Sequence, residues 1–111
     1  MLIDKQDNNI TVVTHEKGTV GAFSAKLEET YEKIRADHII VSLFSLGTIT
    51  IEQLLELLQL SNTHRGAKKS FVLVTDKVNF NEVPEELVVV PTLKEAYDII
   101  EMEEIERDLD F

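Results

Sequence analysis

Three short apolar runs, separated by segments long enough to form helices, constrain the fold of this chain most strongly. They read HIIVSLF, SFVLVT and ELVVV, and they begin at residues 38, 70 and 86. Runs of this length that are rich in β-branched residues are typical of strands covered on both faces. Strands that alternate with helices need crossover connections and pair mostly in parallel. The pattern therefore predicts an α/β fold.

The N-terminal segment adds a hairpin to this pattern. ITVVTHE at residues 10–16 has the composition of a strand, and a DNN turn signal separates it from LID at residues 2–4. We therefore expect a mixed sheet of four to five strands, an N-terminal hairpin followed by largely parallel strands, packed with three to four helices. The helices lie either together on one face of the sheet or on both faces.

Helical spacing of apolar residues predicts helices that begin near Ser24, Thr50 and Thr92, and the second ends near Thr63. The apolar stripe of the first helix consists of Phe23, Leu27, Tyr31 and Ile34. That of the second consists of Ile51, Leu54, Leu55 and Leu58, broadened by Leu57 and Leu60. The sequences TIEQ and TLKE each predict a capping box, with Thr50 paired to Gln53 and Thr92 paired to Glu95.

Length and charge limit the classes of function. A chain of 111 residues forms one domain over residues 1–111, and its formal net charge of -10 disfavours nucleic acid and anionic membrane surfaces as partners. The chain contains no cysteine, and we expect its first residues to form neither a signal peptide nor a membrane span. We expect a cytoplasmic protein.

Residue patterns for catalysis are lacking. His15, His38 and His64 have no metal-ligand spacing, and we expect each to be a surface or edge residue. The sequence has no nucleophile elbow and no glycine-rich phosphate loop. We therefore predict no enzyme activity, no metal and no cofactor.

The one basic run, HRGAKK at residues 64–69, follows the second helix. Cations there complement the helix dipole, and Gly66 is suited to a left-handed cap. The alternative is a docking patch for an acidic partner or for the phosphate of a nucleotide.

The C-terminal segment carries two apolar stripes on different faces of one helix. The first consists of Leu93, Tyr97 and Ile100, and the second of Ile99, Met102, Ile105 and Leu109. One docked face does not bury both stripes. Either the helix ends near Glu101 and the acidic amphipathic tail, residues 102–111, folds back on the domain, or the second stripe is a surface for self-association or for a partner.

The segment HIIVSLFSLGTITIEQLLELLQLSNTHRGAKKSFVLV and the later VVVPTLKEA resemble the strand–loop–helix–strand signature of STAS domains, the fold of bacterial anti-sigma-factor antagonists. The resemblance covers nearly the whole chain in element order and implies a regulatory protein-interaction module. The family's phosphorylated serine lies in a D-S-S-G run at the start of a helix. The corresponding residues here are Thr50, Ile51, Glu52 and Gln53, so Glu52 occupies the phosphoserine position.

These features predict a non-enzymatic module that binds a protein partner or forms a homodimer. The expected interaction surface combines the start of the second helix with the tail stripe: Thr48, Thr50, Glu52, Glu56, Met102, Ile105 and Leu109.

The C-terminal part is also similar to short bacterial proteins that are sometimes labelled ribonuclease Z. The H-x-H-x-D-H metal motif of that enzyme is missing from this chain. The resemblance implies an accessory subunit of an RNA-processing enzyme or a name inherited from a neighbouring gene. A binder of a nucleotide or a small apolar ligand is the third interpretation.

Overall fold

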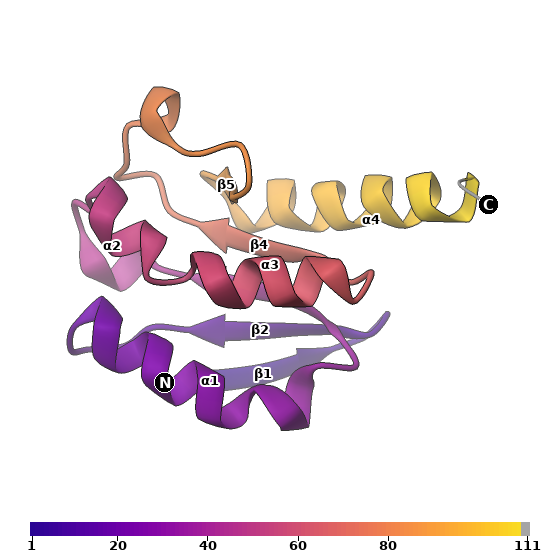
Figure 1. Cartoon of the computed structure of the whole chain (residues 1–111), viewed down its shortest axis with the longest axis horizontal. Helices are drawn as coiled ribbons and strands as arrows, with labels where there is room; N and C mark the ends of the chain where they lie inside the picture. The colour runs from indigo at the N-terminus through magenta and orange to yellow at the C-terminus, as the bar shows by residue number, and fades with distance from the viewer. Residues whose placement is uncertain (110–111) are drawn as a thin grey trace.

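The computed structural model describes residues 1–109, which form a five-stranded sheet with helices on both of its faces (Figure 1). The strands are β1 (Leu2–Gln6), β2 (Ile10–Thr14), β3 (His38–Ser42), β4 (Phe71–Val74) and β5 (Val88–Val90). The α-helices are α1 (Val20–Ile34), α2 (Ile51–Leu55), α3 (Leu58–Gly66) and α4 (Leu93–Leu109). Two 3₁₀ turns, η1 (Phe44–Leu46) and η2 (Phe80–Glu82), lie in the connections after β3 and β4.

The order of strands in the sheet is the order in the sequence, β1-β2-β3-β4-β5. Strands β1 and β2 are antiparallel, and every later neighbour pairs in parallel. The turn between β1 and β2 contains Asn8 and Asn9, both with positive φ, a conformation that asparagine tolerates better than most residues. The predicted α/β class, the hairpin and the largely parallel remainder are confirmed.

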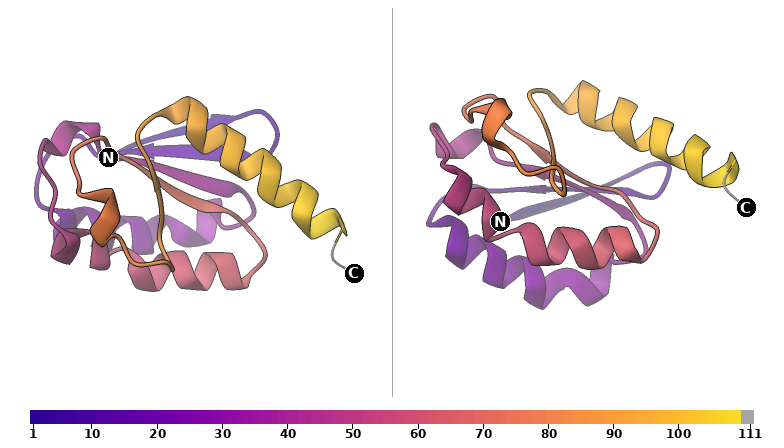
Figure 2. Two further views of the ribbon diagram at one scale, coloured as in Figure 1. Left: turned by 90° about the horizontal axis from the view of Figure 1, so that it is seen from above. Right: turned by 45° about the horizontal axis from the view of Figure 1, so that its top comes forward.

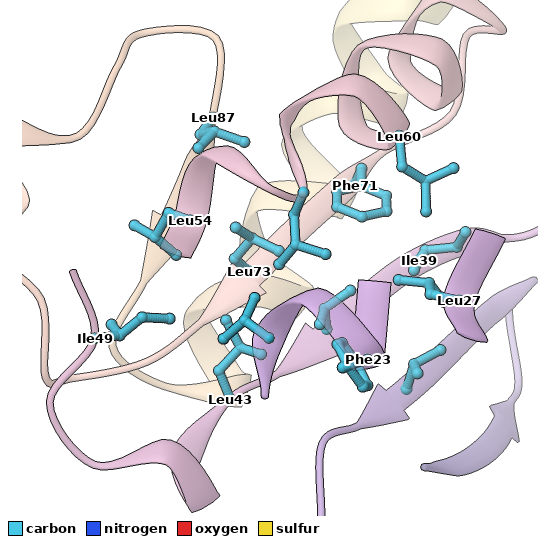
Figure 3. Close-up of a cluster of buried hydrophobic side chains, with 14 of the residues drawn as sticks. Phe23, Leu27, Ile39, Leu43, Ile49, Leu54, Leu60, Phe71, Leu73 and Leu87 are labelled. Atoms are coloured by element: carbon cyan, nitrogen blue, oxygen red, sulfur yellow. The ribbon is translucent and has the colours of Figure 1, made fainter. Parts of the chain in front are cut away.

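The helices are divided unequally between the two faces of the sheet, as Figure 2 shows. Helices α1, α2 and α3 cover one face, where the larger apolar core includes Phe23, Leu27, Leu60 and Phe71 (Figure 3). Helix α4 alone covers the other face, where the buried residues are Ile10, Val12, Ile40, Val72, Val74, Ala96 and Ile100. Within residues 1–109, no helix has the length and apolar character needed to cross a bilayer.

Helix α1 begins four residues earlier than the sequence predicted. Thr19 is its N-cap, because the Thr19 Oγ1 accepts a hydrogen bond of 3.1 Å from the backbone N–H of Ala22. The extra turn buries Val20 against the core. The predicted start at Ser24 is wrong, although the stripe from Phe23 to Ile34 does face the sheet.

The second predicted helix is divided into α2 and α3 by a joint at Glu56 and Leu57. The N–H groups of both residues bond three residues back, to the carbonyl groups of Gln53 and Leu54. The hydroxyl of Ser24 on α1 donates to the carbonyl oxygen of Glu56 over 3.0 Å, so a side chain enters the hydrogen-bond ladder at this point. The change of register leaves Leu55 42% exposed, and its predicted place in the core stripe is wrong.

Two buried serines on helices allow a matched test of hydrogen bonding. Ser61 on α3 is fully buried, and its hydroxyl has no hydrogen-bond partner within residues 1–109, whereas the hydroxyl of Ser24 is bonded. An unsatisfied buried hydroxyl costs about 1–3 kcal/mol, and alanine has the higher helix propensity. We expect Ser61→Ala to raise the free energy of unfolding in urea by about 1 kcal/mol and Ser24→Ala to lower it by a similar amount. If both substitutions shifted the free energy of unfolding in the same direction by the same amount, the two hydroxyls would not differ in hydrogen bonding as described.

Candidate functional site

Helix α4 continues without interruption to Leu109 and exposes three large apolar side chains on its outer side. Met102, Ile105 and Leu109, which we call the outer stripe, are 56%, 53% and 72% exposed. The inner side buries Ala96 and Ile100 on the sheet. The expectation that the helix ends near Glu101 and folds back is therefore wrong for residues 102–109. Residues 110–111 of the predicted tail lie outside the described residues.

A cluster of polar side chains beneath the last turns of α4 determines which side of the helix faces outward. The Glu103 cluster consists of Arg65, Ser70, Glu103 and Arg107. Arg65 donates to one carboxylate oxygen of Glu103, and the Ser70 hydroxyl donates to the other over 2.6 Å. The guanidinium of Arg107 donates to Ser70 Oγ over 2.9 Å. Glu103, at 19% exposure, is thus held by α3 and by the residue before β4.

A buried histidine adds a further contact to the same helix. His38 Nδ1 accepts a hydrogen bond of 2.9 Å from the Ser70 N–H, so the proton of the neutral ring lies on Nε2, which is 3.0 Å from a carboxylate oxygen of Glu104. Burial lowers the pKa of His38 despite the attraction of Glu104, and the nearby cations Arg107 and Lys69 lower it further. The neutral His38 therefore ties β3 to α4.

These contacts give the end of α4 an inverted arrangement. Its charged residues Glu103 and Arg107 face the domain, and its apolar residues face outward. An amphipathic helix on a globular protein normally shows the opposite pattern. Because the inner contacts are specific hydrogen bonds, the exposure of the outer stripe is a fixed property of the folded domain.

The start of α2 forms the other part of the predicted surface. Thr50 is the N-cap, its hydroxyl accepting from the Gln53 N–H over 3.2 Å while the Gln53 side chain accepts from the Thr50 N–H over 2.8 Å. The predicted capping box is therefore confirmed. The four residues predicted for this surface are all exposed: Thr48, Thr50, Glu52 and Glu56. Glu56 lies one helical turn after Glu52. At the start of α4, the Thr92 hydroxyl accepts a hydrogen bond of 3.1 Å from the Glu95 N–H.

The two parts of the predicted surface do not form one patch. Helix α2 lies at one end of the longest axis, beside the carboxyl ends of the parallel strands, and the last turns of α4 lie at the other end (Figure 1). The surface at the start of α2 and the outer stripe are two separate sites.

All three histidines are buried, so their predicted surface positions are wrong. His64 donates through Nε2 to the carbonyl of Asp37 over 2.8 Å and accepts at Nδ1 from the Tyr31 hydroxyl over 2.7 Å. Burial lowers the pKa of His64 and raises that of Tyr31, which keeps this hydrogen bond in its neutral form. His15 lies 2.8 Å from the Gly18 carbonyl through Nε2 and 2.6 Å from Ser45 Oγ through Nδ1.

The basic run spans the end of α3, and its first two residues, His64 and Arg65, are bonded within the domain. Arg65 is paired with Glu103, and Lys68, not Gly66, has the positive φ of 68° at the end of the helix. Arg65, Lys68 and Arg107 line a surface cavity of about 260 Å³ together with Glu103 and Glu106. Since both arginines already lie against Glu103, this cavity does not favour the phosphate interpretation.

A second surface cavity gives little support to a small-ligand site. The cavity beside the β1–β2 turn measures about 490 Å³ and is lined by Tyr97, Ile100, Glu101 and Glu104 on α4. The strand order never reverses within the sheet, so the crevice that binds ligands in doubly wound folds does not form. Within residues 1–109, no group of three or more histidine, aspartate or glutamate residues is placed to hold a metal ion.

The sequence predicted the three residues of the outer stripe, but it wrongly placed Ile99 with them, since Ile99 is partly buried against the core beneath α4. It also wrongly placed Leu93, which is 38% exposed, in the inner stripe. The Glu103 cluster that orients the helix was not predicted. The only signal for the cluster was the presence of Glu103 and Arg107 four residues apart on the same side as Ile100. Neither a protein-family model nor a curated protein matches this chain.

Proposed function

We propose that this chain is a non-enzymatic, STAS-like regulatory module that binds a protein partner through the outer stripe of α4. The observation that carries the proposal is the fixed exposure of Met102, Ile105 and Leu109 above the Glu103 cluster. A contiguous exposed apolar surface with a charged border commonly marks an interface. The N-terminal hairpin followed by parallel strands is the order that the resemblance to STAS domains implies, and it supports this class.

The fixed charge of Glu52 supports a module without the phosphorylation switch. Glu52 lies exposed in the first turn of α2, where the helix dipole favours an anion. A carboxylate carries about half the charge of a phosphate and has two acceptor oxygens in place of three. We therefore propose the start of α2 only as a secondary site, for a contact other than the one that the outer stripe makes.

Affinity purification with quantitative mass spectrometry tests the proposal. We expect a defined protein to be retained by the unaltered chain and reduced at least tenfold by Ile105→Asn. Leu93→Asn is the matched control, because Leu93 lies exposed at the start of the same helix, outside the outer stripe. Both variants should keep the melting temperature, since neither side chain is buried.

Glu52→Lys separates the two surfaces in the same experiment. Because α2 lies at the other end of the domain, binding through α4 should withstand this change. A partner lost with Glu52→Lys and kept with Ile105→Asn would move the docking site to the start of α2. If Ile105→Asn alters the recovery of no protein, the proposed function is wrong.

A further inference from the structure

The border of the outer stripe indicates what kind of partner it binds. Helix α4 carries seven carboxylates and two cations. By helical spacing, Glu101 and Asp108 lie on one side of the outer stripe and Glu106 on the other. All three are exposed, and none forms an ion pair within residues 1–109, whereas Asp98 is paired with Lys94 and Glu103 with Arg65.

Two of these carboxylates lie where the helix itself disfavours them. Glu106 and Asp108 are in the last turn of α4, near the negative end of the helix dipole, where cations are favoured. Arg107, the one cation of that turn, points inward to Ser70, and Asp108 has no ion pair within residues 1–109. Glu106 lines the same surface cavity as Arg65, Lys68 and Arg107 but forms an ion pair with none of them. Carboxylates at the negative end of a helix that no ion pair offsets are typical of a functional surface.

The same charges argue against a second copy of this chain as the occupant. Two copies of α4 packed through their outer stripes would bring Glu101, Glu106 and Asp108 of both chains together, and like charges across an interface are strongly unfavourable. The spacing of Met102, Ile105 and Leu109, at i, i+3 and i+7, matches recognition of another amphipathic helix. Three side chains form a surface smaller than stable dimers need, which fits transient binding of a short segment.

We infer that the outer stripe binds a short amphipathic helix whose apolar face is bordered by lysine or arginine. This inference rests on the proposed function and names its partner class. The apolar face of that helix packs on Met102, Ile105 and Leu109. Its cations lie beside Glu101, Glu106 and Asp108 and supply the charge that the last turn of α4 lacks.

Titration with designed helical peptides tests the inference by fluorescence anisotropy. The probes are an amphipathic peptide of leucine and lysine and its counterpart of leucine and glutamate. We expect the lysine peptide alone to bind, with affinity at least tenfold weaker in Ile105→Asn. The triple variant Glu101→Gln, Glu106→Gln, Asp108→Asn should weaken binding at least tenfold and flatten its dependence on salt.

A second triple variant controls for attraction to the net charge. Glu28→Gln, Glu29→Gln and Glu86→Gln change the charge equally at exposed positions outside α4 and should leave binding unaltered. Equal weakening by both triple variants, or binding of the glutamate peptide, would overturn the inference.

Sedimentation velocity distinguishes failure of the inference from failure of the proposed function. A dimer of the unaltered chain that Ile105→Asn dissociates would show that the outer stripe is an interface but that the partner class is wrong. If Ile105→Asn changes neither peptide binding, self-association nor protein recovery, the proposed function fails as well.

Discussion

Replacing Glu103 with alanine lowers the free energy of unfolding by about 2–3 kcal/mol, because it leaves Arg65, Arg107 and Ser70 without their shared acceptor. The value lies between those for exposed and fully buried ion pairs, since Glu103 is partly buried. For a domain of this size the change corresponds to a fall of about 10 °C in melting temperature. Urea denaturation followed by circular dichroism measures it.

Glu101→Ala is the matched control for this change. Glu101 lies on the same helix and is exposed, so its replacement carries the same gain in helix propensity and should alter stability by less than about 0.5 kcal/mol. Glu103→Gln retains an acceptor for the Ser70 hydroxyl, so its free energy of unfolding should lie between those of Glu103→Ala and Glu101→Ala. Equal stability of Glu103→Ala and Glu101→Ala would show that the Glu103 cluster does not hold α4.

Acidification from pH 7.5 to pH 5.5 destabilises the domain through His38 and His64. Burial lowers the pKa of both rings below the ordinary value of about 6.5 in the unfolded chain. Between the two pKa values the unfolded chain binds more protons, so stability is complete above pH 6.5 and falls as the pH decreases. The slope is at most about 1.4 kcal/mol per pH unit for each histidine.

Urea denaturation at pH 7.5, 6.5 and 5.5 measures this loss, and variants identify the groups responsible. Asparagine at position 38 keeps an acceptor for the Ser70 N–H, and glutamine at position 64 keeps both a donor and an acceptor. The double variant His38→Asn, His64→Gln should be less stable at pH 7.5 but should lose less on acidification than the unaltered chain. If both chains lose the same free energy, the two rings are not the titrating groups.

The sequence predicted the elements that depend on local pattern. The strands at HIIVS and FVLV, the hairpin turn at Asn8 and Asn9, and the Thr50 cap each follow from composition and spacing within a few residues. The outer stripe was predicted in the same way, since Met102, Ile105 and Leu109 recur at helical intervals.

Features that depend on contacts between distant segments were not predictable. The joint between α2 and α3 depends on the hydroxyl of Ser24, which lies 32 residues before Glu56. The burial of His64 depends on Tyr31 and the carbonyl of Asp37, and the orientation of α4 depends on Arg65 and Ser70. No local pattern indicates which polar residues meet across the fold.

The unequal covering of the sheet has a consequence for motion. Three helices pack on one face of the sheet, whereas on the other face α4 contributes only Ala96 and Ile100 as fully buried residues. The free energy of detaching α4 is therefore smaller than that of global unfolding, and its amides exchange with solvent through a local opening that leaves β2, β3 and β4 intact. A segment bound across the last two turns of α4 closes that opening and slows exchange in α4 alone.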